Sequence, residues 1–287
     1  MNIIQDTELI LNEENKIYHL NLSKDQIANN ILLVGDPSRV EMISNKFNHI
    51  EYKVHNREFI THTGYIKGNR ISVVSTGIGT DNIDIVINEL DALVNIDLNK
   101  KTINKAKKSL NLIRLGTCGS LQKDIPIDSI IVSSYSLGFD GLAHFYKNND
   151  VIEKEIAKEY QKHTNFAEKN AEPYFIKAST NLLNKFHDIQ QGITVTAPGF
   201  YGPQGRSLRL KSSIDDLHEK LSSFNFNNHK IINFEMECSA LYYLGRSLGH
   251  NTLTLCVALG NRITKEYSKN YHKTMNKMIN LIIERLF

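Results

Sequence analysis

Cysteine is scarce in this sequence of 287 residues, and it follows no pattern that would bind a metal. The three cysteines, Cys118, Cys238 and Cys256, form no even set for a disulfide framework and lack the paired spacing of metal ligands. All three lie among apolar or small residues, where buried free thiols are common. These observations predict a soluble protein of the reducing cytoplasm with no metal site.

Long apolar runs and an excess of one charge are also missing. No segment approaches the roughly 18 apolar residues of a membrane span, and Met1–Asn15 carries acids instead of the apolar core of a signal peptide. Basic and acidic residues number 34 and 31, for a net charge of +3. This balance gives no electrostatic reason to expect nucleic acid or membranes as partners. The most basic stretch, Asn99–Lys108, is interpreted as a solvated surface.

With only 5 prolines, no low-complexity run and no break in composition, the sequence lacks a linker, and residues 1–287 are predicted to form a single domain. Apolar, β-branched runs predict strands at Asn30–Gly35, Glu51–Asn56, Glu58–Ile66, Arg70–Gly77, Asn111–Cys118, Ser129–Gly138, Gly192–Pro198 and Asn251–Leu259. Helical spacing predicts helices at Ser38–Phe47, Thr80–Val94, Glu235–Gly249 and Asn270–Leu286. This alternation predicts an α/β fold with three layers, a mixed, mostly parallel central β-sheet flanked by helices.

Short glycine-rich turns follow several predicted strands, at the edge where ligands collect in such sheets. Gly35 ends the first strand and Arg39 follows it in Gly-Asp-Pro-Ser-Arg, while Arg114 precedes Leu-Gly-Thr-Cys-Gly-Ser, which contains Thr117. Freed backbone amides, a hydroxyl and forked guanidinium donors suit an oxyanion such as phosphate. Each turn alone is better explained by a tight turn beside an arginine in a surface or core-edge ion pair, but their joint occurrence favours the anion site.

Two further stretches carry groups that suit a sugar and a planar base. Glu235 and Glu237 lie where an apolar run meets a helix, and they suit either the helix macrodipole or the vicinal hydroxyls of a ribose. The loop at Ala197–Arg209 offers Gln204 as donor and acceptor, Arg206 as donor, and Phe200 or Tyr201 for stacking. That loop is either a polar surface segment or a site that recognises the edge of a base.

The order of these motifs resembles the nucleoside phosphorylase family with the purine nucleoside/uridine phosphorylase fold, and within it the uridine phosphorylases. The resemblance runs from about His19 to the C-terminus, and it is carried by GDPSR, RLGTCG, FYGPQGR and FEMECSAL. It implies an enzyme that transfers a pentosyl group, by phosphorolysis of uridine to uracil and ribose 1-phosphate in nucleoside salvage. The alternatives are a purine nucleoside phosphorylase and a non-catalytic nucleoside- or phosphate-binding module on the same fold.

The resemblance also assigns roles to individual positions. It implies a phosphate site made by Gly35, Arg39, Arg114, Thr117 and, from a neighbouring subunit, Arg57. It implies a ribose site made by Glu235, Met236, Glu237 and a His19 that crosses the same interface. It implies a base site made by Phe200, Gln204, Arg206 and Arg262. The residues implied to act in catalysis are Arg39, Arg114, Gln204, Arg206 and Glu237.

Departures from the family pattern bear on the base, the cofactor and the assembly. Asn261-Arg262 follows the last strand where purine-specific members carry an aspartate, which favours a pyrimidine, and GDPSR favours phosphorolysis over hydrolysis. Phosphate is expected as a co-substrate without a cofactor, and a monovalent-cation site around Glu58, Ile78 and Asn82 stays an open alternative. Because Arg57 and His19 would come from a neighbour, self-association is expected, with a dimer as the minimum and a hexamer as the alternative.

Overall fold

The computed structural model describes residues 3–164 and 171–287, and its central feature is a 12-stranded mixed β-sheet. The strands along its main path are, in spatial order, β11 (Asn225–Phe226), β12 (His229–Glu235), β10 (Gln190–Thr196), β8 (Ile130–Gly138), β13 (Asn251–Asn261), β7 (Asn111–Ser120), β1 (Asn30–Val34), β4 (Asn69–Ser75), β3 (Phe59–Ile66) and β2 (His49–Asn56). Two short strands extend it, β9 (Tyr174–Lys177) beside β8 and β14 (Glu266–Tyr267) beside β13. A separate hairpin joins β5 (Ile96–Asp97) to β6 (Thr102–Ile103).

One half of the sheet closes on itself, because β12 pairs both with β10 and with β7. The strands β12, β10, β8, β13 and β7 therefore form a ring, and β1, β4, β3 and β2 extend from it as a wing. Irregularities in register at Ile193/Thr194 and Ala258/Gly260 accompany this curvature, as bulges do elsewhere. The pairings of β7 with β1 and β13 are parallel, so their carboxyl ends meet at one edge.

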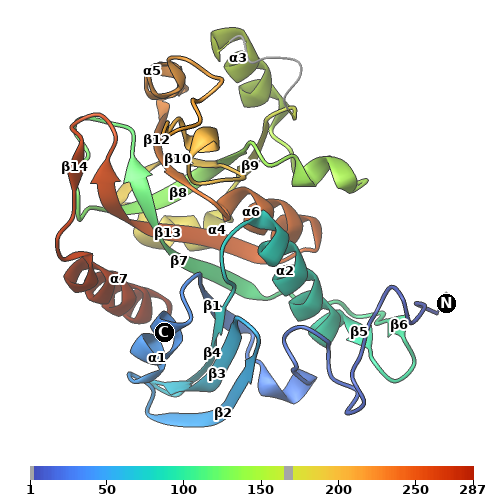
Figure 1. Cartoon of the computed structure of the whole chain (residues 1–287). Helices are drawn as coiled ribbons and strands as arrows, with labels where there is room; N and C mark the ends of the chain where they lie inside the picture. The colour runs from blue at the N-terminus through green and yellow to red at the C-terminus, as the bar shows by residue number, and fades with distance from the viewer. Residues whose placement is uncertain (1–2, 165–170) are drawn as a thin grey trace.

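Helices cover both faces of the sheet, as Figure 1 shows for α2 (Thr80–Asn95) and α6 (Cys238–Ser247) on one side of β7 and α1 (Ser38–Ser44) and α7 (Tyr271–Leu286) on the other. The remaining helical segments are α3 (Lys154–Thr164), α4 (Thr180–Leu183), α5 (Leu217–Ser223) and the 3₁₀ turns η1 (Lys24–Gln26), η2 (Leu142–Phe145), η3 (Asn184–Phe186) and η4 (Gly202–Gln204). In α2 the expected apolar spacing is fully buried, and its members are Ile83, Val86, Ile87 and Leu90. Burial of such a stripe is what stabilises a helix of this length.

The predicted α/β class and mixed sheet are confirmed, but two helix boundaries were wrong. The helix expected from Glu235 begins at Cys238, because Glu235 is the last residue of β12 and its carboxylate accepts backbone N–H groups of the first turn. The helix expected to reach Phe47 ends at Ser44, where the chain turns toward β2. β12 itself, hidden in an apolar run, was not among the predicted strands.

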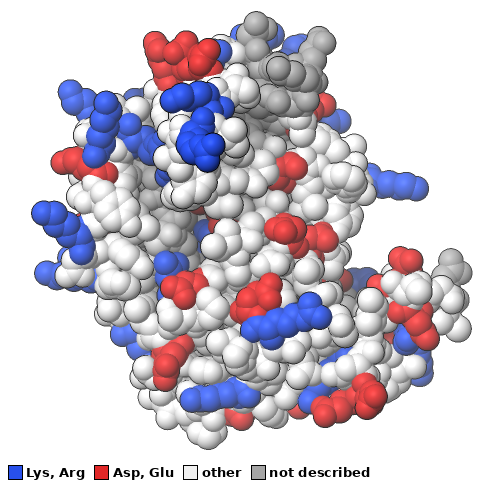
Figure 2. Space-filling model, viewed as in Figure 1, with Lys and Arg blue, Asp and Glu red and all other residues white. Residues whose placement is uncertain are grey.

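The sheet joins distant parts of the chain, since β1 and β13 both pair with β7. This supports the proposal that residues 1–287 form a single domain. Within the described ranges, no helix combines the length and the hydrophobicity needed to cross a bilayer. Figure 2 shows acidic and basic side chains interspersed on the viewed face, with basic ones gathered over the region of β14 and α5.

At Gly245 in α6, we predict that alanine destabilises the protein, although helix propensity alone favours alanine over glycine. A Cβ at this position of α6 would overlap the γ-methyl carbon of Thr252 on β13. We expect Gly245→Ala to lower the free energy of unfolding in urea by about 1–3 kcal/mol through overpacking, although alanine is ordinarily favoured over glycine in helices by about 1 kcal/mol.

The control is Thr252→Ser, which removes only the obstructing methyl group. In the double variant Gly245→Ala/Thr252→Ser, most of the lost stability should return because the two sites are in contact. A rise in the unfolding midpoint for Gly245→Ala alone would contradict the packing argument.

Candidate active site

A cavity of about 1220 Å³ lies at the carboxyl ends of β1, β7 and β13, where ligands collect in sheets of this kind. Its wall is completed by the start of α2, the β12–α6 junction, the β13–β14 turn and the loop before α5. The predicted site residues that the structure brings together here are Gly35, Arg39, Arg114, Thr117, Phe200, Gln204, Arg206, Glu235, Met236, Glu237 and Arg262. His19 and Arg57 do not line this cavity.

One end of the cavity is formed by the turn between β1 and α1. A Cβ at Gly35 would lie 3.2 Å from the carbonyl oxygen of Gly77, so glycine allows the β1 and β4 turns to approach each other closely. Arg39 is 9% exposed, and its guanidinium makes no hydrogen bond or ion pair to another described residue. A nearly buried guanidinium without a carboxylate partner is well suited to an anionic ligand.

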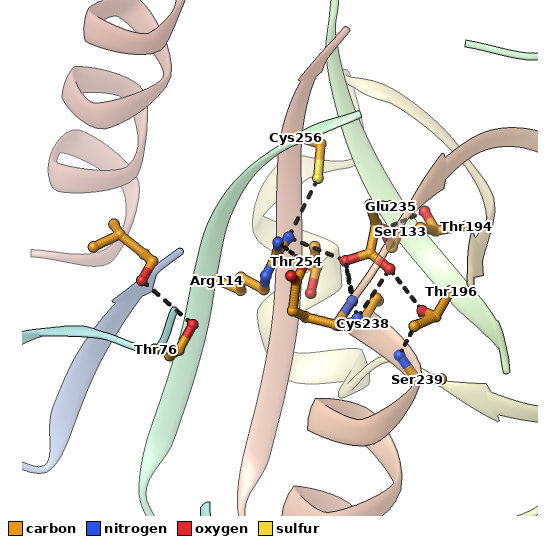
Figure 3. Close-up of polar contacts among 12 residues, drawn as sticks. Thr76, Arg114, Ser133, Thr194, Thr196, Glu235, Cys238, Ser239, Thr254 and Cys256 are labelled. Atoms are coloured by element: carbon orange, nitrogen blue, oxygen red, sulfur yellow. Dashed lines mark hydrogen bonds and ion pairs between the residues drawn. The ribbon is translucent and has the colours of Figure 1, made fainter. Parts of the chain in front are cut away.

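Arg114 lies in the middle of the cavity wall, where Figure 3 shows it between strands with its guanidinium directed at two carboxylates. Its Nη1 is 3.2 Å from Glu235 Oε2, and its Nη2 donates to Glu237 Oε2. The side chain folds over Gly116, where any Cβ would collide with the guanidinium. Burial alone would lower the pKa of Arg114, but the charges of Glu237 and Glu235 outweigh it and raise the pKa, so the arginine stays protonated.

Glu235 is a structural anchor of this wall. Its carboxylate accepts hydrogen bonds from Thr196 Oγ1 at 2.6 Å and from the backbone N–H groups of Glu237 and Cys238 at 2.9 Å. Burial and the adjacent Glu237 raise its pKa to about 7, against the opposing effect of Arg114. These bonds leave it little capacity for a ligand, so its position fixes the helix start and its neighbour Glu237.

Glu237 connects three elements at the cavity surface. Its Oε1 accepts the backbone N–H of Gly79 at 2.9 Å, which joins the start of α6 to the start of α2. Its Oε2 accepts from Arg114, and Met236 lines the cavity beside it. Each carboxylate oxygen retains a further lone pair, so Glu237 can still accept from a hydroxyl group in the cavity.

The opposite end of the cavity is formed by the loop before α5. Gln204 is 4% exposed, and its Oε1 accepts from Arg206 Nη1 at 2.5 Å. The Arg206 guanidinium carbon lies 3.7 Å from the centre of the Phe200 ring, within reach of a cation–π contact. Burial, together with the nearby positive charge of Arg262, lowers the pKa of Arg206 to about 10. This end thus combines an amide, two cations and an aromatic ring.

His218 is a cavity residue that the sequence did not identify. It is the second residue of α5, and its Nε2 lies 2.9 Å from the carbonyl oxygen of Gln204 and 3.3 Å from Arg262 Nη2. Burial lowers its pKa, as do the charges of Arg262 and Arg206, and this favours the neutral ring. No sequence motif surrounds His218. Its contact with Gln204, which exists only in the folded chain, is what identifies it as a site residue.

His19 and Arg57 lie together on another surface. His19 Nδ1 is 2.7 Å from Glu89 Oε1, and Arg57 Nη2 donates to Tyr18 Oη at 3.2 Å while covering the Tyr18 ring. Asn56 Nδ2 donates to the carbonyl oxygen of His19 at 2.8 Å. The two residues that the resemblance assigned to a neighbouring subunit are therefore close to each other and do not line this chain's own cavity, although Glu58, next to Arg57, does.

The candidate monovalent-cation residues border the cavity near Arg39. Glu58, Ile78 and Asn82 all line it, and Asn82 Nδ2 donates to Glu58 Oε1 at 3.4 Å. Among residues 3–164 and 171–287, no group of three or more His, Cys, Asp and Glu side chains is placed to hold a metal ion. The cation site stays a prediction.

This chain is similar in sequence and in fold to nucleoside phosphorylases. The family model described as the phosphorylase superfamily matches residues 30–285. The uridine phosphorylase of Thermococcus kodakarensis is 30% identical over 264 residues, covering 90% of this chain and 82% of that relative. A DeoD-type purine nucleoside phosphorylase of Clostridium novyi is 27% identical, covering 93% of this chain and 97% of its own.

A solved structure is also similar to this chain. The crystal structure of a Trypanosoma brucei nucleoside phosphorylase, described as showing uridine phosphorylase activity, matches with a TM-score of 0.87 at 28% identity. The match covers 97% of this chain and 99% of the other. Proteins with these names are pentosyltransferases, and this chain is an enzyme of that class. The chain belongs to the phosphorylase superfamily, among its nucleoside phosphorylases.

Proposed function

We propose that this enzyme cleaves uridine with phosphate, giving uracil and ribose 1-phosphate. A phosphate oxygen attacks C1′ as the bond from C1′ to N1 breaks, and the bonding electron pair leaves with uracil, whose anion gains the proton that the hydrogenphosphate gives up. The proposal is carried mainly by the contact between Gln204 and Arg206 at the base end of the cavity. The uridine and nucleoside phosphorylases similar to this chain support it further.

The polar groups at the base end complement the edge of a uracil ring. Uracil presents an N–H donor between two carbonyl acceptors. Gln204 offers an amide donor beside an oxygen that keeps a free lone pair after accepting from Arg206, and Arg206 adds a second donor. One acceptor and two donors are the groups that the N–H and the two carbonyl oxygens of the uracil edge require. Phe200, 50% exposed at the cavity wall, provides an apolar surface for the ring or the ribose.

The position that would serve a purine is already occupied by internal contacts. Asn261 Nδ2 donates to the carbonyl oxygens of Gln122 and Ile125 at 2.8 and 2.9 Å, and its Oδ1 accepts from the backbone N–H groups of Ile263 and Thr264. The amide therefore has no donor left for a purine ring nitrogen. This favours uridine over inosine, although purine phosphorylases are also among the relatives.

The charges in the cavity suit a leaving group that departs as an anion. Arg206 and Arg262 line the base end, and neither makes an ion pair with a carboxylate of the described chain. Donors directed at the developing charge on the uracil oxygens would stabilise the transition state, so no general acid is required at the base. Phosphate is the co-substrate, and the reaction balances with no cofactor in the proposal.

The ribose and phosphate roles follow from the other end of the cavity. Arg39 and Thr117 are proposed to bind phosphate with the turn at Gly35, and Arg114 to position it while paired with the two glutamates. Glu237, which keeps capacity to accept hydroxyl groups, is proposed to hold the ribose with Met236. In this arrangement, the rigid strand ends hold phosphate in line with C1′.

A dimer is proposed as the smallest active unit. Arg57 and His19 lie outside this chain's own cavity, yet they are next to each other and at least partly exposed. A second copy that presents this pair to the cavity would complete the phosphate and ribose sites, and a symmetric pair would do so reciprocally. A hexamer built from such dimers is the alternative assembly.

The first measurement is release of uracil from uridine with and without phosphate, with inosine as the parallel substrate. We expect uracil release that depends on phosphate and exceeds base release from inosine. Base release from inosine alone would contradict the proposal that Gln204, Arg206 and Asn261 favour a pyrimidine base. A lack of turnover with both nucleosides would contradict the proposal as a whole.

Arg206→Met tests the base end directly. We expect kcat to fall by about 10²–10³-fold, the usual loss when a donor to a developing anion is removed. The matched control is Arg209→Met, a change of the same type on an exposed residue of the same loop that does not line the cavity. Equal steady-state rates for the two variants would argue against the role of Arg206.

Mixed dimers test whether the site is shared. Arg39→Met and Arg57→Met should each abolish most activity as homodimers, because each removes one phosphate ligand from every site. A co-expressed mixed dimer would contain one site with both arginines, so roughly a quarter of wild-type activity should return in a random equal mixture. Activity no higher than that of the separate variants would show that Arg57 does not serve a neighbouring subunit's site.

A further inference from the structure

The loop that carries the proposed base-recognition residues is hydrogen-bonded to the rest of the described chain through a single atom, although Ile214 near its end also packs against the core. We define this base-recognition loop as residues 199–214. Its described hydrogen bonds are internal, such as those from the backbone N–H groups of Gln204 and Arg206 to the carbonyl oxygen of Tyr201. Within the described chain, the bonds that leave the loop converge on the carbonyl oxygen of Gln204.

Two side chains meet at that oxygen, and His218 is the nearer. His218 Nε2 lies 2.9 Å from it, whereas Arg262 Nη2 lies 3.4 Å away at the limit of a hydrogen bond. A carbonyl oxygen only accepts, so Nε2 of His218 carries the proton. The same Gln204 uses its side-chain oxygen to bind Arg206, so fixing its backbone fixes both base-recognition groups.

The ring of His218 is itself held in place. It contacts the edge of Phe234 on β12, with 6.1 Å between ring centres, and Phe234 precedes the anchored Glu235. On its other side lies Gly205, whose φ of +70° places it in the left-handed region. A Cβ at Gly205 would lie 3.0 Å from Nε2, so the turn rests directly on the imidazole.

We propose that His218 is a positioning residue for base recognition, which holds Gln204 and Arg206 in the cavity through the Gln204 carbonyl oxygen. The inference rests on the proposed function, because it assumes that these two residues contact the nucleobase. Arg39 and Glu237 belong to α1 and the β12–α6 junction, and neither contacts the loop by a hydrogen bond in the described chain. Loss of the His218 contact therefore affects the nucleoside and leaves the phosphate site intact.

The test compares two replacements of His218 by amide side chains of different length. The amide nitrogen of His218→Gln can occupy nearly the position of Nε2 and donate to Gln204, whereas that of His218→Asn is one carbon shorter and cannot. The control is His163→Asn, since His163 on α3 contacts the Lys220 carbonyl oxygen and Ser223 on α5 but does not line the cavity. Each variant is measured for KM of uridine, KM of phosphate, kcat and thermal midpoint.

We expect His218→Asn to raise the KM of uridine by about 10-fold, the scale of one lost hydrogen bond, and to lower kcat because Arg206 also shifts. The KM of phosphate should change less than about 2-fold, since its site lies on other elements. His218→Gln should restore most of the loss, and His163→Asn should behave as wild type.

Three results would overturn the proposal: an unchanged KM of uridine in His218→Asn, an equal rise in both KM values, or no advantage of glutamine over asparagine. The assay of the wild-type enzyme distinguishes failure of the His218 positioning role from failure of the proposed function. If wild type releases uracil in a phosphate-dependent manner while the His218 variants match it, the positioning role alone fails. If wild type does not turn over uridine, the proposed function fails first.

Discussion

The buried contact of Arg114 with Glu235 and Glu237 is the constraint on which the rest of the site depends. One guanidinium and two carboxylates are held out of water, with exposures of 5% or less for all three side chains. Removing one partner from such a cluster typically costs about 3–5 kcal/mol, because an unpaired charge stays buried. The cluster links β7 to β12 and, through Glu237 and Gly79, to the start of α2. The cavity wall is therefore fixed by electrostatics as well as by packing.

The two ends of the cavity differ in how many contacts hold their backbone in place. The residues proposed to bind phosphate and ribose project from strand ends and helix starts, where paired strands and buried hydrogen bonds hold the backbone. The proposed base-recognition loop, by contrast, makes most of its hydrogen bonds within itself and is hydrogen-bonded to the body at the Gln204 carbonyl oxygen. If the proposed roles hold, a rigid sugar–phosphate end and a separately held base end suit an enzyme family whose members, by name, act on either pyrimidine or purine nucleosides.

Most of the site could be predicted because its groups lie in short motifs that follow strands. Gly35 and Arg39 follow β1 and Thr117 lies near the end of β7, and the carboxyl ends of these parallel strands meet at one edge of the sheet. The structural role of Glu235 was harder to predict, since a glutamate at the start of a helix suits either a helix cap or a ribose ligand, and the sequence does not distinguish them. His218 was missed because a lone histidine in a polar segment has no pattern, and its partner is a backbone oxygen 14 residues away.

The sequence by itself determined the α/β class, the strands that end in glycine turns and the family, because apolar periodicity and local motifs depend on neighbouring residues. Only the tertiary structure decided that β12 closes a ring by pairing with β7, and that this closure brings Glu235 and Glu237 against Arg114. It also decided that Arg57 and His19 lie outside their own cavity and that His218 supports Gln204. These contacts join segments far apart in the chain, and their geometry depends on how the whole sheet curves.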